Sequence, residues 1–181
     1  EKLILSEDPV TFAAFFTEPI LAAGGVIVPP AGYFRALQEL LHKHDILLVC
    51  DEVVTAFGRT GNMFGATTMD IAPDMLVCAK GLSSAYIPIS ALMVNERIFR
   101  AMVRQSDEVG LFGLTMTYSG HPVAAAVARE AIRIYEEDDI PARVRRLQTP
   151  FLDGLHAFAD HVLVGQVRGT GLLAGVELVR D

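Results

Sequence analysis

The sequence predicts an α/β fold built on a mostly parallel sheet. Short, continuously apolar runs alternate with amphipathic stretches along its 181 residues. Runs that are apolar throughout are typical of strands buried on both faces, as in a parallel sheet. Hydrophobic residues make up 51% of the chain, which excludes a disordered protein. The predicted strands cover residues 12–17, 46–50, 75–79 and 89–94.

The stretches between and after these runs have the three-to-four residue apolar spacing of helices. Pro30 and Pro122 suit first helical turns, because proline lacks the N–H that a first turn leaves unpaired. Asn95 is of a residue type that caps helix N-termini. The predicted helices cover residues 30–44, 95–103, 122–135 and 142–159. In the last segment, 162–178, glycines interrupt strand-like runs, and we interpret them as turns and bulges.

Charge and composition argue against several classes of protein. Lys and Arg number 15 and Asp and Glu 22, so the formal net charge is −7. No basic cluster stands out, which argues against nucleic-acid binding. The longest uncharged stretch, 109–128, has a polar centre broken by glycine and proline, so we expect no membrane span. Cys50 and Cys78 lie in apolar runs, which predicts buried, reduced thiols and a cytoplasmic protein.

Three of the predicted strands end in an ionisable residue. Glu18, Asp51 and Lys80 follow the first, second and third runs. Because ligands of open parallel sheets bind at the carboxyl edge of the strands, these side chains are expected to share a site. A desolvated lysine beside carboxylates can serve as a Schiff-base amine. An aspartate facing it could hold a protonated ring nitrogen, the usual protein handle on pyridoxal phosphate.

Several sequence blocks together resemble the class III aminotransferases, in the order and spacing of that family. They are Glu18-Pro19-Ile20 with Gly24-Gly25, Asp51-Glu52-Val53, Phe57-Gly58-Arg59-Thr60-Gly61, Pro73-Asp74, Lys80-Gly81-Leu82 and Thr117-Tyr118-Ser119-Gly120-His121-Pro122. They cover nearly the whole chain. The ω-amino acid and amine:pyruvate transaminases are the branch that looks most similar.

The resemblance implies the large domain of a pyridoxal-phosphate-dependent transferase, with the aspartate aminotransferase-like fold (fold type I). Residues 1–138 would be part of this cofactor-binding domain and its mostly parallel sheet. Residues 139–181 would form the connecting helix and the start of the small C-terminal α+β domain. The family's phosphate loop, its ring-stacking aromatic residue and its carboxylate-binding arginine lie outside the segment that this chain matches. We therefore expect an internal part of a longer protein, inactive by itself.

The resemblance also implies residue roles. Lys80 matches the Schiff-base lysine and proton shuttle, and Asp51 matches the carboxylate that keeps the pyridine nitrogen protonated. Val53 matches a residue packed on one face of the ring. Thr117 matches a hydroxyl that binds the cofactor phosphate of the partner subunit, which implies a homodimer with shared active sites and allows a tetramer of such dimers. Glu18 matches an acidic residue near the substrate pocket.

The expected function is transamination with pyridoxal 5'-phosphate (PLP), from an amine or amino-acid donor to a keto-acid acceptor, for which we expect pyruvate. Other class III chemistry remains an alternative, namely decarboxylation, racemisation or an aminomutase reaction. A non-catalytic homologue is a third interpretation. A nucleotide-binding domain is disfavoured, because no Gly-rich turn follows the first strand. Glu52 is left as a structural or undetermined residue, and no metal site is expected.

Overall fold

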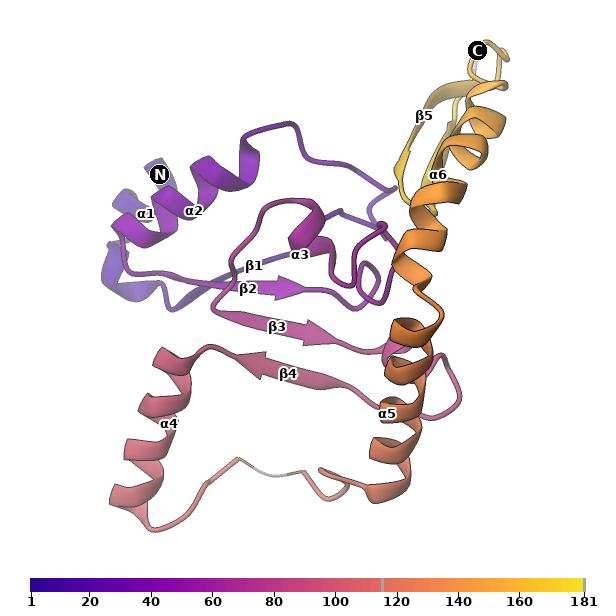
Figure 1. Cartoon of the computed structure of the whole chain (residues 1–181). Helices are drawn as coiled ribbons and strands as arrows, with labels where there is room; N and C mark the ends of the chain where they lie inside the picture. Colours follow the sequence, from indigo (N-terminus) through magenta and orange to yellow (C-terminus); the bar gives the residue numbers. More distant parts are fainter. Residues whose placement is uncertain (115, 181) are drawn as a thin grey trace.

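The computed structural model describes residues 1–114 and 116–180. Four strands form one sheet in the order β1 (Ala14–Thr17), β2 (Leu47–Asp51), β3 (Met75–Cys78) and β4 (Ala91–Val94). The first three are parallel, and β4 is antiparallel to β3 (Figure 1). The prediction of an α/β fold with a mostly parallel sheet is confirmed.

Burial on both faces is correct for the central strand but wrong for the edges of this sheet. Leu48, Val49 and Cys50 of β2 are all buried. On β1 the Phe16 side chain is 70% exposed, and on β4 Leu92 is 55% exposed. The chain between β3 and β4 holds a short turn, η2 (Lys80–Ser83), instead of a crossover helix. The chain therefore returns as β4, antiparallel to β3. The apolar character of a strand does not indicate whether it runs parallel or antiparallel to its neighbour.

The predicted helices form, with shifted ends. They are α2 (Tyr33–Lys43), α4 (Glu96–Val109), α5 (Pro122–Glu137) and α6 (Ile140–His156); the short elements are α1 (Lys2–Ser6), η1 (Pro9–Thr11) and α3 (Gly65–Thr68). Asn95 caps α4 as predicted, because its Oδ1 accepts a 3.0 Å hydrogen bond from the Ile98 N–H. Asp139 caps α6 by accepting from the Ala142 N–H, so α6 begins earlier than the predicted residue 142.

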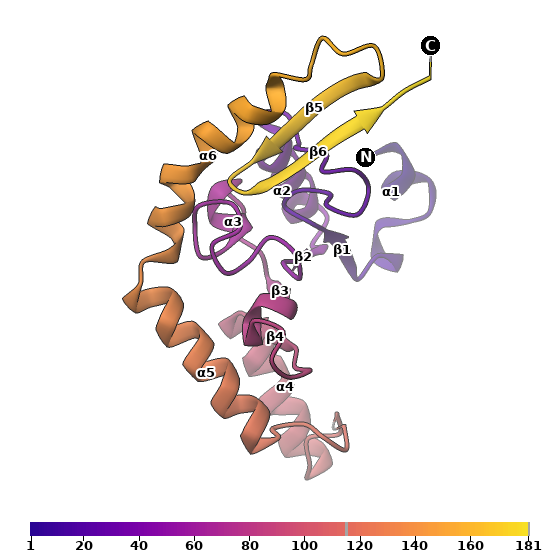
Figure 2. The ribbon, with the colours of Figure 1, turned by 90° about the vertical axis from the view of Figure 1, so that its right-hand side faces the viewer.

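The last segment forms an antiparallel hairpin of β5 (Val164–Thr170) and β6 (Leu173–Leu178). Figure 2 shows it lying alongside α6. The register shifts between Val164 and Gln166, and Gly171 adopts a φ of +59° in the turn. The interpretation of these glycines as a bulge and a turn is therefore correct. The proposed boundary between residues 138 and 139 falls in the short link between α5 and α6 and stays a prediction.

Two apolar clusters cover the sheet. Phe34 and Leu41 of α2 pack with Leu48 and Cys50 of β2, and Ala128 of α5 packs near Cys78 and Leu82. Both cysteines are buried and free, as predicted. No helix in the described part of the chain combines the length and apolar character needed to cross a membrane.

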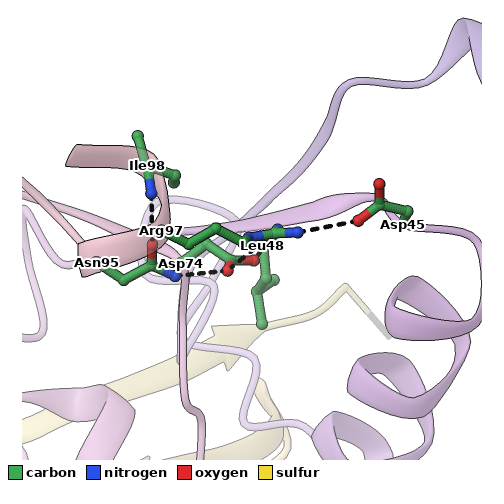
Figure 3. Close-up of polar contacts among 6 residues, drawn as sticks. All are labelled: Asp45, Leu48, Asp74, Asn95, Arg97 and Ile98. Atoms are coloured by element: carbon green, nitrogen blue, oxygen red, sulfur yellow. Dashed lines mark hydrogen bonds and ion pairs between the residues drawn. The ribbon is translucent and has the colours of Figure 1, made fainter. Parts of the chain in front are cut away.

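Asp74 joins the strand ends that lie opposite the predicted site (Figure 3). Its Oδ2 accepts a 2.9 Å hydrogen bond from the Leu48 N–H, and its Oδ1 accepts a 2.7 Å bond from the Asn95 side chain. Arg97 lies 3.6 Å from Asp74 and 3.0 Å from Asp45. These contacts connect β2, β3 and the end of β4, and so fix the register that brings the carboxyl ends of β2 and β3 together.

Candidate active site

Asp51 and Lys80 lie at the same edge of the sheet. Asp51 ends β2 and pairs with Val77 of the neighbouring parallel strand, and Lys80 follows β3 three residues after Val77. In Figure 1 this edge faces α5 and α6. The structure thus places Asp51 and Lys80 at the carboxyl ends of two neighbouring parallel strands, as the strand ends predict, while the catalytic roles of both stay predictions.

The Asp51 carboxylate is half-buried and has one oxygen in use. Its Oδ1 accepts a 3.0 Å hydrogen bond from the Val53 N–H. Its Oδ2 has no hydrogen-bond partner among residues 1–114 and 116–180. A carboxylate held in orientation by one oxygen and open at the other can accept a proton donor from a ligand.

Lys80 begins a turn whose backbone is unusual and firmly held. Its φ of +46° is uncommon for a non-glycine residue, and such conformations cluster at functional sites. The next carbonyl, Gly81 O, accepts a 2.6 Å hydrogen bond from the Tyr135 hydroxyl of α5. A Cβ at Gly81 would lie 3.0 Å from Cδ2 of Phe57, so the turn packs closely on that ring. The Lys80 side chain itself is exposed.

Glu18 and Val53 lie at the same edge as Asp51. Glu18 follows β1, the parallel neighbour of β2, and its Oε2 accepts a 3.0 Å hydrogen bond from the Ala22 N–H. Val53 comes two residues after Asp51 and is half-buried. Three parallel strands therefore present four of the five predicted site residues along one edge.

Thr117 is not brought to this edge within the chain. It is exposed and lies in the turn before α5, whereas the Lys80 turn contacts Tyr135 near the other end of that helix (Figure 1). The helical rise between Pro122 and Tyr135 is about 20 Å. Among the described residues, Thr117 forms no hydrogen bond with Asp51, Val53 or Lys80.

The whole chain, residues 1–181, matches the family model described as Aminotransferase class-III. The chain belongs to the class III aminotransferases. Vanillin aminotransferase of Capsicum annuum is 50% identical over 181 residues, which are 100% of this chain and 39% of that protein. Gamma-aminobutyrate transaminase 1, mitochondrial, of Oryza sativa subsp. indica is 51% identical over 177 residues, 98% of this chain and 34% of that protein.

Solved structures of transaminases share the fold. The crystal structure of the omega transaminase from Pseudomonas jessenii in complex with PMP superposes with a TM-score of 0.96 at 48% identity, covering 98% of this chain and 39% of that one. The resemblance to class III aminotransferases and the expected fold type I are thus confirmed. This class III chain spans less than two fifths of the length of the curated relatives described above.

The donor set at the edge fits the cofactor of this family. A pyridine ring with a protonated nitrogen needs an acceptor, and Asp51 Oδ2 is such an acceptor. An aldehyde carbon needs an amine, and Lys80 can supply one. Of the three lysines in the sequence, Lys2 lies in α1 and Lys43 in α2, whereas Lys80 comes just after the end of strand β3. In this class III chain Asp51 and Lys80 are therefore the residues suited to hold PLP.

Glu52, left from the sequence as a structural or undetermined residue, is tightly held in the structure. Its side chain is 0% exposed, and its carboxylate accepts hydrogen bonds from Thr55, Gly65 and Ala66. Burial, with smaller contributions from the charges of Glu52 and Asp51, raises the pKa of the neighbouring Cys50 thiol to about 12. The available signal was a second acid directly after Asp51, since a glutamate at the end of a buried run needs partners.

Proposed function

We propose that the protein containing this chain is a PLP-dependent aminotransferase. It takes an amino group from an amine or ω-amino acid and gives it to a keto acid, with pyruvate as the acceptor. One observation carries the proposal: the Lys80 amine and the partly unpaired Asp51 carboxylate share the carboxyl edge of two neighbouring parallel strands. Membership of the class III family and the activities in the names of the relatives support it.

Asp51 would hold the ring of the cofactor. A carboxylate beside a pyridine nitrogen favours its protonated form. The Val53 N–H on Oδ1 orients the carboxylate so that Oδ2 can receive that proton donor. Val53 would pack its side chain on one face of the ring. When bound, PLP supplies an aldehyde that condenses with amines and a ring that withdraws electrons from the substrate carbon.

Lys80 would hold the cofactor and move the proton. Its backbone is fixed through Gly81 by Tyr135 and Phe57, so the four-carbon side chain is the part free to reach two positions. One position is the cofactor's aldehyde carbon, and the other is the substrate carbon that bears the nitrogen. A fixed base on a flexible stem suits proton transfer between two nearby carbons.

Thr117 and Glu18 extend the proposal beyond one copy of the chain. The exposure of Thr117 in the turn before α5, together with the family resemblance, supports a homodimer in which Thr117 binds the partner's cofactor phosphate. Two such dimers could pair as a tetramer. Glu18 would lie near the substrate pocket, and its hydrogen bond from the Ala22 N–H fixes its direction. We also propose a cytoplasmic location, which the free, buried Cys50 and Cys78 favour.

An amino-transfer assay on the full-length protein tests the function. The protein with PLP is given pyruvate and either γ-aminobutyrate or a primary aromatic amine, and alanine formation is measured by chromatography. We expect donor-dependent alanine that is lost in Lys80→Ala and kept in Lys43→Ala, an exposed lysine of α2. Carbon dioxide release or racemisation without alanine would assign the other class III chemistry. PLP binding with none of these reactions would favour a non-catalytic homologue.

A further inference from the structure

Glu52 is a fully buried acid that the proposed chemistry does not use. Its Oε2 accepts hydrogen bonds of 2.6 Å from the Thr55 hydroxyl and 2.9 Å from the Gly65 N–H. Its Oε1 accepts a 2.5 Å bond from the Ala66 N–H. No basic side chain in the described part of the chain forms an ion pair with it. Three donors on two oxygens match a carboxylate, which only accepts hydrogen bonds.

The backbone of Glu52 is held as firmly as its side chain. Its N–H donates a 2.8 Å hydrogen bond to the Val77 carbonyl of β3, and its carbonyl accepts a 3.1 Å bond from the Ala56 N–H. Its chain neighbours are Asp51 and Val53, the two residues that the proposed function places against the cofactor ring. Any rotation of residue 52 would therefore turn both of them.

Gly65 leaves the space that the Glu52 carboxylate needs. A Cβ at position 65 would lie 2.7 Å from the Thr55 Cβ and 3.1 Å from Glu52 Oε2. Contacts below 3 Å force a shift of the neighbour. The start of α3 is thus shaped around this carboxylate, with bare backbone where a side chain would push it away.

The turn that Glu52 begins, closed by the hydrogen bond from the Ala56 N–H to the Glu52 carbonyl, also reaches the lysine. Phe57 directly follows this turn with a φ of +58°, and its N–H donates a 2.6 Å hydrogen bond to the Met63 carbonyl. Its ring lies against Gly81, where a Cβ would be 3.0 Å from Cδ2. The chain held by Glu52 therefore touches the residue directly after Lys80.

We propose that Glu52 is a positioning residue for the cofactor site. It holds Asp51 and Val53, and through Phe57 the Lys80 turn, in the relative orientation that the PLP ring requires. This inference rests on the proposed function, since it concerns the same cofactor. The competing interpretation is that Glu52 contributes to folding stability alone and leaves the orientation of the ring unchanged.

The test compares PLP binding by full-length wild-type protein and the Glu52→Gln variant. The amide places an NH₂ donor against a backbone N–H, so one hydrogen bond is lost and both of the N–H groups that face each other are left unpaired. We expect the PLP dissociation constant, measured by equilibrium dialysis, to rise about tenfold or more. At saturating PLP we expect a changed circular dichroism band of the bound cofactor, which reports ring orientation. Glu39→Gln, an exposed charge removal on α2, should change neither quantity.

Each outcome decides the proposal. A Glu52→Gln protein that melts at lower temperature but keeps the wild-type dissociation constant and dichroism band overturns it. If Glu52→Gln does not fold, Thr55→Val removes a single donor and should shift both quantities in the same direction, with Thr55→Ser restoring them. An unchanged Thr55→Val also overturns it. Wild-type protein that binds no PLP overturns the proposed function and, with it, this inference.

Discussion

The Tyr135 hydroxyl donates a 2.6 Å hydrogen bond to the carbonyl of Gly81, the residue after Lys80. The Tyr135 ring also lies 5.8 Å, centroid to centroid, from the ring of Phe57. One helix, α5, thus supports the lysine turn both by a hydrogen bond and by ring packing. Because α5 also follows the turn that contains Thr117, both parts of the predicted site border this helix.

Replacement of Asp51 by Asn should preserve PLP binding but reduce turnover. The amide keeps the size of the side chain but lacks the charge that favours a protonated ring nitrogen. We expect turnover to fall about 100-fold or more, measured as alanine formation at saturating PLP. Asp153→Asn, on the exposed side of α6, is the matched control. Near-normal turnover of Asp51→Asn would remove the proposed role of this carboxylate.

Replacement of Thr117 by Ala should weaken PLP retention without blocking the attachment of PLP to Lys80. A hydrogen bond to a charged phosphate contributes about 1.5–3 kcal/mol, which predicts a dissociation constant about 10- to 100-fold higher. Thr149→Ala, at an exposed threonine on α6, should leave the dissociation constant unchanged.

Mixed dimers test whether the two subunits share their active sites. A Thr117→Ala subunit paired with a Lys80→Ala subunit should contain one intact site if sites are shared. Two defective sites in every mixed dimer would contradict sharing.

Two glycine substitutions should change stability in opposite directions. Gly171 has a φ of +59°, and a Cβ there would lie 2.3 Å from the Arg59 carbonyl oxygen. We expect Gly171→Ala to lower the free energy of unfolding by about 3 kcal/mol. Gly154 lies within α6, and a Cβ there meets no atom within 4 Å. Gly154→Ala should raise the same quantity by about 0.5–1 kcal/mol. Thermal and denaturant unfolding measure both, and equal effects would contradict the close approach of the hairpin to residue 59.

The two cysteines should be unreactive in the folded protein. Burial raises the pKa of Cys50 to about 12 and also raises the pKa of Cys78, so both are neutral thiols at pH 8. Since the folded pKa of Cys50 lies above its ordinary value of 9.0, its contribution to stability is complete below pH 9 and is lost as the pH rises toward 12. Labelling with a thiol reagent at pH 8 should be slow in native protein and fast after unfolding. Fast native labelling of Cys50 would contradict its burial.

Local signals in the sequence predicted much of the fold. The continuous apolar run of β2, the cap at Asn95 and the proline at the start of α5 each act through neighbouring residues, so they can be read without a structure. The ionisable residues at the strand ends predicted the edge at which Asp51 and Lys80 lie together. Their roles are implied by the family resemblance and stay predictions.

Features that depend on distant residues could not be predicted in this way. The direction of β4 depends on the turn after Lys80 and not on the run itself. Glu52 is buried because the Gly65 and Ala66 N–H groups reach it from a later segment, and a second acid after Asp51 indicates a need for partners without indicating which residues supply them. The close packing of Gly171 against Arg59 likewise joins residues that lie far apart in the sequence.

Borohydride reduction of the full-length protein with PLP, followed by peptide mass mapping, tests the central claim most directly. Within this segment the lysines are Lys2, Lys43 and Lys80, so a modified peptide is assigned without ambiguity. We predict a single pyridoxyl group, on the peptide that contains Lys80. A folded protein that carries no pyridoxyl group, or carries it on another lysine, would contradict the assignment of this sheet edge as the cofactor site.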